Sequence, residues 1–261
     1  MCKAVSLIKR LSSRQAGAMM NNKKYKAVAV ILLSLLGVSS GLSVAQTSAG
    51  PIPTEGDPED FIGHSEPLRV VHILDEPRHR TVFKGDSFTL LDVQINPGDT
   101  TLPHTHDGPI LYTFISNGQG YLDGRLSSIT RYLDEAYTHR VTNAGPGLFR
   151  IIALASFGPG LSDPSDDLPT GLEASDVELE NPWFRAWRLT LEPGARHASI
   201  AHINPAFVVQ VSPAGALHVQ RQDGVTHELD AAGDWAAPMQ AYELHNPGSE
   251  PVTLVIKEVR Q

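Results

Sequence analysis

Apolar runs of five to eight residues alternate with turn-forming residues from residue 68 to the end of the chain. Breaks such as Pro97-Gly98, Asn117-Gly118 and Gly145-Pro146-Gly147 separate these runs. Runs of this length bounded by Gly, Pro and Asn are typical of β-strands, and no long segment carries a helical period. The pattern therefore predicts an all-β fold. The predicted strands are Leu68–Leu74, Phe88–Ile95, Ile110–Ile115, Phe149–Leu154, Phe184–Leu191, Phe207–Val211, Ala216–Gln220 and Val252–Val259.

The strand pattern occurs twice. Leu91–Gly98 parallels Trp187–Gly194, and at the same offset of 96 residues His106 falls on His202. A repeat of this size indicates two copies of one compact β unit. Each copy is near the lower size limit for a stable core, so we expect the two to pack on each other. The further matches are Leu111 with Phe207 and Asn143–Gly145 with Asn246–Gly248.

The first 45 residues have a different character. They contain seven basic residues and no acidic one, and the basic stretch Asn22–Lys26 precedes the apolar run Ala27–Val38. Small residues before Gln46 resemble a cleavage site, so residues 1–45 are predicted to be a Sec-type signal peptide cleaved after Ala45. The run is short for a bilayer span, and an uncleaved anchor is the alternative interpretation. Whether translation starts at Met1, Met19 or Met20 stays open.

The single cysteine of the chain, Cys2, lies in this segment. Cleavage would leave the mature protein with no disulfide and no thiolate ligand. No cysteine follows the apolar run, which excludes lipid attachment there. We therefore expect a periplasmic or secreted protein.

The mature part of the chain is acidic. After residue 45 lie 14 of the 21 basic residues and all 29 acidic residues, a formal balance of −15. Such a surface repels phosphate backbones and anionic lipid, so we expect no nucleic-acid partner. We also expect no stable membrane span after cleavage. The expected partner is a small-molecule ligand or substrate, and a homo-oligomer is an open alternative.

Segments rich in Pro, Gly, Ser and Asp suggest where the domains end. Residues 46–67 are predicted to be a flexible lead-in and residues 158–181 a linker, which leaves domains at 68–157 and 182–261. The acidic residues Asp163, Asp166 and Asp167 in the linker lack the pattern of a calcium loop and are expected to be solvated. The aromatic residues that open the second domain are expected to pack in the core and between domains. They are Trp183, Phe184 and Trp187.

Three histidines carry the candidate chemistry. His104 and His106 are two residues apart, so on a strand both imidazoles leave the same face. Two such rings can bind one metal ion, and a third from another strand, such as His139, can complete the site. The alternative is a metal-free protein with unused histidines, although unpaired imidazoles inside a barrel would be costly.

Around these residues the chain resembles the cupin superfamily. The first cupin motif is Gly, five residues, His-x-His, three or four residues, Glu, six residues, Gly. The chain matches every fixed position except the Glu, where Leu111 stands. The matching residues are Gly98, His104, His106 and Gly118.

The second cupin motif is matched in part. It contributes a histidine with an asparagine four residues on, which His139 and Asn143 match. Its usual upstream Pro-x-Gly is absent, because Asp134 and Ala136 stand there. The resemblance covers roughly residues 68–261 and implies a bicupin, with two tandem cupin-type jelly-roll barrels.

The resemblance makes His104, His106 and His139 the metal ligands, without the usual carboxylate. Such a set is similar to that of the minority of cupin-type dioxygenases that use three histidines. We expect Leu111 to enlarge and dry the cavity beside the metal. Next to it, Tyr112 points away from the side of Leu111 and is expected only to pack. Asp107 is expected to cap the turn Asp107–Pro109, with a role in orienting His106 as the alternative.

The second copy departs from the motif. Ile200 replaces the first ligand histidine, whereas His202 keeps the second. We expect no tight metal binding there. Phe207 or Val208 stands at the Glu position, and Tyr242 or Glu243 at the third ligand. A separate site of His197, His202, His227 and His245 is a weaker alternative to surface or hydrogen-bonded histidines.

The sequence favours a metal-binding bicupin that acts as a dioxygenase-like oxidoreductase on a small organic molecule. A neutral three-histidine site leaves open coordination positions and keeps the full charge of one divalent transition metal (Fe, Mn, Cu or Zn), which favours an anionic substrate. Export of an unfolded chain would favour Cu(II) or Zn(II) over Fe(II). The alternatives are a zinc-type isomerase or lyase and a non-catalytic periplasmic binding or scaffold cupin.

Overall fold

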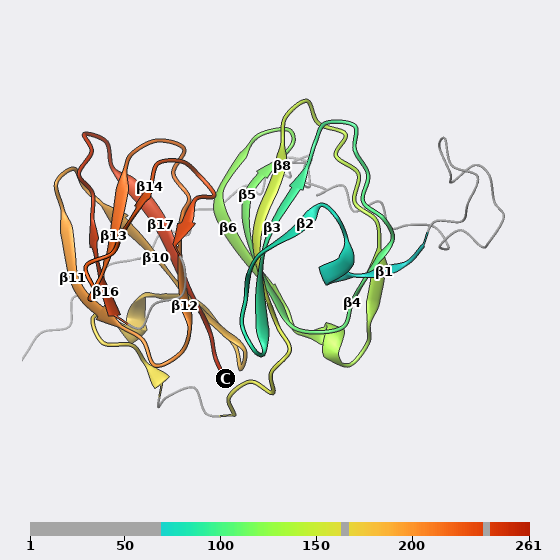
Figure 1. The fold of residues 1–261 in the computed structure, drawn as a ribbon, viewed down its shortest axis with the longest axis horizontal. Coiled ribbons are helices and arrows are strands. Elements are labelled where there is room, and N and C mark those ends of the chain that lie inside the picture. The colour runs from blue at the N-terminus through green and yellow to red at the C-terminus, as the bar shows by residue number, and fades with distance from the viewer. Residues whose placement is uncertain (1–68, 163–166, 237–240) are drawn as a thin grey trace, which may run out of the picture. The chain divides into compact units, whose positions relative to one another are not determined.

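A computed structural model of the chain describes residues 69–162, 167–236 and 241–261 (Figure 1). The predicted signal peptide with Cys2, the lead-in 46–67, and Asp163 and Asp166 lie outside the described residues. Every described element is a strand or a short 3₁₀ turn, which confirms the all-β prediction. Within those ranges no helix is long and apolar enough to cross a membrane.

The first half of the described chain forms two sheets. The larger is antiparallel with the strand order β2-β3-β8-β5-β6, and the smaller has the order β1-β4-β7. A 3₁₀ turn, η2, follows β1, and another, η3, precedes β7. The elements are β1 (Val71–His72), η2 (Ile73–Asp75), β2 (His79–Lys84), β3 (Phe88–Ile95), β4 (His104–His106), β5 (Ile110–Asn117), β6 (Tyr121–Ile129), η3 (Arg131–Leu133), β7 (Tyr137–His139) and β8 (Phe149–Ser156).

The second half also forms two sheets, with the orders β9-β10-β17-β12-β15 and β11-β16-β13-β14. The elements are η5 (Ala174–Asp176), β9 (Val177–Glu180), β10 (Phe184–Leu191), β11 (Arg196–Ala201), β12 (Ala206–Gln210), β13 (Leu217–Arg221), β14 (Thr226–Leu229), β15 (Trp235–Ala236), β16 (Ala241–His245) and β17 (Val252–Val259).

The larger sheets of the two halves share one strand order, so the sequence repeat is also a repeat in the structure. β2-β3-β8-β5-β6 corresponds to β9-β10-β17-β12-β15, and the pair β4–β7 corresponds to β11–β16. In each half the sheets, as described, do not join into one closed hydrogen-bonded barrel but have the layered arrangement of a jelly roll. The prediction of two tandem cupin-type jelly-roll units is confirmed in this form.

Two asparagines hold corresponding corners of the halves. The Nδ2 of Asn143 donates to the carbonyls of Ile95 and Gly147, and its Oδ1 accepts from the amide of Gly145. The Nδ2 of Asn246 donates in the same way to Leu191 and Glu250, while its Oδ1 accepts from Gly248. The motif asparagine therefore closes the loop between β7 and β8 rather than contributing to chemistry.

The inner strands β3, β8, β12 and β17 of the larger sheets are buried on both faces. In β3, Leu91, Val93 and Ile95 face the interior of the first half, whereas Leu90 faces the second half. A shared apolar cluster joins Leu90, Leu111, Ile152 and Leu154 to Phe184, Phe207, Val209 and Val255, so the halves pack through these sheets as expected. Trp183 and Phe184 also pack in this cluster, and Trp187 packs in the second half's own core, as predicted.

Two local predictions were wrong. Leu68–Leu74 was expected to be one strand, but β1 is short and η2 follows it, because the His72 side chain accepts a hydrogen bond from the Leu74 amide. Asp167 was expected to be solvated, but it is buried and paired. It accepts hydrogen bonds from Arg185, Asn204 and Arg260.

Candidate metal centre

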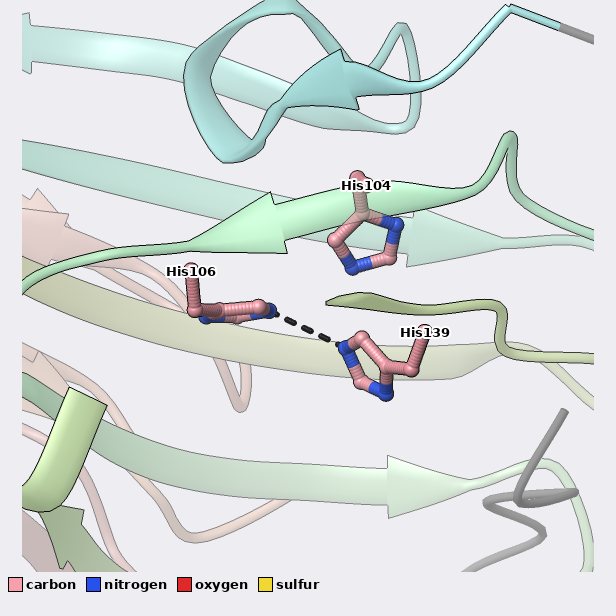
Figure 2. Close-up of side chains that lie close together, drawn as sticks. All are labelled: His104, His106 and His139. Atoms are coloured by element: carbon pink, nitrogen blue, oxygen red, sulfur yellow. Dashed lines mark hydrogen bonds between the residues drawn. The ribbon is translucent and has the colours of Figure 1, made fainter. Parts of the chain in front are cut away.

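β4 and β7 bring the three predicted histidines together. In the antiparallel pairing His104 lies opposite His139 and His106 opposite Tyr137. Because a strand alternates its faces, His104 and His106 point to one side. Thr105 points to the other side and hydrogen-bonds with Thr138. Figure 2 shows ring nitrogens of all three histidines directed toward one point.

The nitrogens have the spacing that a metal ion requires. One candidate ligand atom from each histidine lies within 4.8 Å of the other two. The Nε2 atoms of His106 and His139 are 3.0 Å apart. Two nitrogens bound at right angles, about 2.1 Å from an ion, would be about 3 Å apart. The Nε2 of His104 is buried with no hydrogen-bond partner among the described residues, so the three residues fit a shared ion.

Neighbouring groups orient two of the rings. The Nδ1 of His104 donates to the Leu102 carbonyl at 2.9 Å, which leaves the lone pair on Nε2. The Nδ1 of His106 lies 3.5 Å from the Tyr112 hydroxyl. The Nδ1 of His139 is buried and has no partner in the described part of the chain. Support of this kind sets which nitrogen of a histidine faces a metal.

The site holds its imidazoles neutral. Burial lowers the pKa of His106 to about 2 and the pKa of His139 to about 4, and it also lowers the pKa of His104. The neighbouring histidines lower the pKa values of His106 and His139 further. Neutral imidazole is the form that binds a metal, so no proton has to leave before an ion binds at neutral pH.

A cavity of about 250 Å³ opens beside the histidines. Apolar side chains form most of its wall, and nearly all of them come from β3, β5, β6 and β8 of the larger sheet. The polar exceptions are His79, His104, His106, His139, Tyr112, Arg125 and Ser127. The apolar residues of the wall are Ile73, Leu91, Val93, Ile95, Ile110, Phe114, Leu122, Ile129, Val141, Phe149, Ile151 and Ala153.

The expected role of Leu111 was wrong. Leu111 does not line the cavity but faces the second half, in the cluster that joins the two larger sheets. Tyr112, expected only to pack, lines the cavity and approaches His106. Tyr112 does point away from the side of Leu111, as predicted, but the cavity lies on the side of Tyr112. Because side chains alternate between the two faces of β5, Tyr112 takes the cavity position that was expected for Leu111, and Leu111 packs on the other face.

His79 is a site residue that the sequence analysis missed. It is buried at the start of β2, lines the cavity, and packs edge-on against His104 with ring centroids 4.5 Å apart. Its Nδ1 donates to the Ile73 carbonyl, so its Nε2 keeps the lone pair. Burial lowers the pKa of His79 to about 3. No motif contains His79, and the residues at the start of β2 are polar, so the sequence pattern does not predict a strand there.

Asp107 takes neither of its expected roles. It is exposed, and its carboxylate contacts the Nε2 of His72 at 3.0 Å. The pair links β1 to the end of β4. Asp107 therefore supports the strand that carries His104 and His106, without contacting either ring.

The second half replaces the histidine cluster with a hydrogen-bonded set of His202, Tyr242 and Glu258. Tyr242 lies opposite Ile200, so it takes the third ligand position. The His202 Nε2 contacts the Tyr242 hydroxyl at 2.9 Å, and its Nδ1 contacts the Glu258 carboxylate. All three side chains are buried. Both ring nitrogens of His202 are thus occupied by protein groups.

The other histidines of the second half do not gather around His202. His218 and His245 lie edge-on to each other with ring centroids 5.9 Å apart, and His227 stands on the neighbouring strand β14. Among the described residues, His104, His106 and His139 are the one group of three or more candidate ligand residues whose atoms converge.

The described fold is thus two tandem cupin-type jelly-roll units, and the first of them carries the histidine cluster. No protein-family model matches the sequence, and no curated protein matches it. Similar solved structures include AerE from Microcystis aeruginosa, at 13% identity over 71% of this chain and 99% of that chain, with a TM-score of 0.47. They also include a cupin 2 conserved barrel domain protein from Leptotrichia buccalis, at 10% identity over 69% and 88% of the chains, with a TM-score of 0.42. A salicylate 1,2-dioxygenase from Pseudaminobacter salicylatoxidans is similar at 12% identity over 66% and 71%, with a TM-score of 0.41.

Proposed function

We propose that this chain is an exported, metal-dependent oxidoreductase that acts on a small organic molecule in the cavity of its first half. His104, His106 and His139 would hold one divalent transition metal. The observation that carries the proposal is the convergence of three buried, neutral imidazoles at the wall of a largely apolar cavity. Unpaired polar groups in such a place would otherwise be costly.

When bound, a redox-active metal in a three-histidine site supplies open positions where oxygen and a chelating substrate can meet. The chain's own residues set the surroundings. Apolar side chains such as Ile110 and Ile151 exclude water from the cavity. Burial raises the pKa of the Tyr112 hydroxyl well above its ordinary value, so this hydroxyl keeps its proton and can donate to a bound substrate.

His79 adds an acceptor to the same wall. Its Nε2 carries a lone pair beside His104, while its Nδ1–H is held by the Ile73 carbonyl. The cavity thus has one fixed acceptor in His79 and one fixed donor in Tyr112. These polar groups favour catalysis over a purely structural role for the cavity.

Purified mature protein tests the chemistry. We expect about one equivalent of metal per chain and oxygen uptake with at least one small organic acid in a screen. Protein isolated from its native compartment without metal would contradict both an oxidoreductase and a zinc enzyme. One equivalent of zinc with no oxygen uptake would contradict the oxidoreductase alone and favour isomerase or lyase chemistry.

Export is tested separately by sequencing the N-terminus of the mature protein. Cleavage after Ala45 would give a chain that begins at Gln46. An N-terminus at Met1, Met19 or Met20 in protein recovered from the cytoplasm would contradict export. That result would leave the chemistry of the histidine site open to its own test.

A further inference from the structure

Arg125 is a cation on the wall of the largely apolar cavity. It stands on β6, is exposed, and lines the same cavity as His104, His106 and His139. Its side chain has no hydrogen bond or ion pair with another described residue, whereas the side chain of the neighbouring Arg188 is held by Glu178 and by the carbonyls of Asp123 and Gly124. The guanidinium of Arg125 is therefore available to a ligand.

The register of β5 and β6 places Arg125 at a distance from the histidines. Tyr112, which approaches His106, lies opposite Ser127, and Phe114 lies opposite Arg125. All four residues of these two pairs line the cavity. Two residues along a strand span about 7 Å, so Arg125 stands one such step beyond the Tyr112–Ser127 pair. Phe114, opposite Arg125, gives the cavity wall an apolar surface at the level of the guanidinium-bearing residue.

The charges of the cavity suit an anion. No acidic side chain lines it in the described part of the chain. Arg125 is the one arginine or lysine on the cavity wall among the described residues. A guanidinium presents two parallel N–H donors that match a carboxylate.

We propose that Arg125 binds the carboxylate of the substrate, and that the substrate is a small organic acid whose apolar body lies along Phe114 and Tyr112. The reacting end of the acid would then lie at the histidines. This inference rests on the proposed function for the identity of the bound molecule as substrate. The binding of the acid itself can be measured without metal or turnover.

Calorimetry on chelator-treated protein tests the inference. The probes are benzoate and the straight-chain carboxylates from butyrate to octanoate, each compared with its neutral amide. We expect the wild type to bind at least one acid more tightly than its amide, and Arg125→Gln to weaken that acid roughly tenfold. Arg196→Gln removes the same charge from a position outside the cavity and should change nothing.

Charge reversal gives an independent readout. Arg125→Glu should lose the preference for benzoate and gain one for benzylamine. The inference is overturned if every acid binds no better than its amide, or if Arg125→Gln and wild type bind acids equally. It is also overturned if Arg125→Glu keeps the preference for the acid. A metal-loaded, oxygen-consuming enzyme with any of these results would leave the proposed function intact. If acids bind in an Arg125-dependent way to a protein that takes up no metal, the proposed function is contradicted and the inference about Arg125 stands.

Discussion

What a histidine does in this fold depends on the contacts of its two ring nitrogens. His104 donates through Nδ1 to a carbonyl, and its Nε2 stays free toward the centre of the cluster. His202 occupies the matching region of the second half, but protein groups contact both of its nitrogens. The same residue type is therefore a candidate metal ligand in one half and an internal hydrogen-bonding group in the other.

His106→Ala is expected to abolish metal binding, and His202→Ala is expected to leave it unchanged. His106 contributes one of the two Nε2 atoms that are 3.0 Å apart, and two histidines alone make a weak site. The measurement is metal content after equilibration and desalting. If His202→Ala loses the metal and His106→Ala keeps it, the metal site lies in the second half and the assignment to the first half is contradicted.

Asn143→Ala is expected to lower the free energy of unfolding by about 2 to 4 kcal/mol, because it leaves two carbonyls and one amide without their partner. Asn246→Ala removes the same set of bonds and should cost a similar amount. Asn117, whose side chain accepts from the amides of Gln119 and Gly120 at the surface, is the control. Chemical denaturation measures the free energy of unfolding of the three variants. The prediction is contradicted if Asn117→Ala lowers it as much as Asn143→Ala or Asn246→Ala does.

The central element is β5, because the alternation of its side chains decides what reaches the site. Ile110, Tyr112 and Phe114 face the cavity, whereas Leu111 and Thr113 face away from it toward the second half. The first cupin motif allows three or four residues between His-x-His and its Glu. The motif alone therefore does not decide which of two adjacent positions on β5 faces the cavity. One position along the strand changes a site residue into an interface residue.

Leu111→Glu and Tyr112→Glu are expected to have opposite effects. The first substitution would place a carboxylate in the dry cluster between the sheets, which should cost at least about 3 kcal/mol of stability without improving metal binding. The second would place the carboxylate beside His106 and should tighten metal binding. Thermal unfolding and metal titration measure the two effects. Tighter metal binding in Leu111→Glu, and none in Tyr112→Glu, would reverse the assignment of the faces.

The sequence could predict elements whose pattern is local. The strands Phe88–Ile95, Phe184–Leu191 and Val252–Val259 have the bounds predicted, because apolar runs and flanking turns define them. The convergence of His104, His106 and His139 was also predictable, since spacing and motif placed all three.

The rest depended on contacts that no local pattern records. His79 reaches the site because β2 pairs with β3 and turns its first residue inward. Asp167 looked like a linker residue, but Arg185 and Arg260, which come later in the chain, bury it. In each case a partner distant in sequence decides the environment, and only the assembled sheets show that partner.

At the scale of the whole molecule, the two halves share a buried seam with an ionisable lysine inside it. Lys257, on β17 of the second half, is fully buried. Its Nζ donates to the Ile152 carbonyl at 2.9 Å and to the Thr113 hydroxyl at 3.3 Å, both in the first half. Burial lowers the pKa of Lys257 to about 7.

Lys257 is expected to make stability rise with pH between about 7 and 10. Its pKa is lower in the folded protein than its ordinary 10.5, so in this range the unfolded chain holds more protons. The free energy of unfolding should rise by up to about 1.4 kcal/mol per pH unit. Lys257→Met keeps the other titrating groups and should lack this rise. Parallel pH profiles of denaturation for the two proteins would contradict the prediction.

The hydrogen-bonded set of His202, Tyr242 and Glu258 bears on how the protein is assembled when transition metals are scarce. The second half completes its equivalent site with protons and side chains already in the chain. We therefore expect the second half to fold without a bound metal ion. Its larger sheet would then already be formed when the first half packs against it. Metal supply would then govern when the histidine site of the first half is filled, while the second half would fold without it.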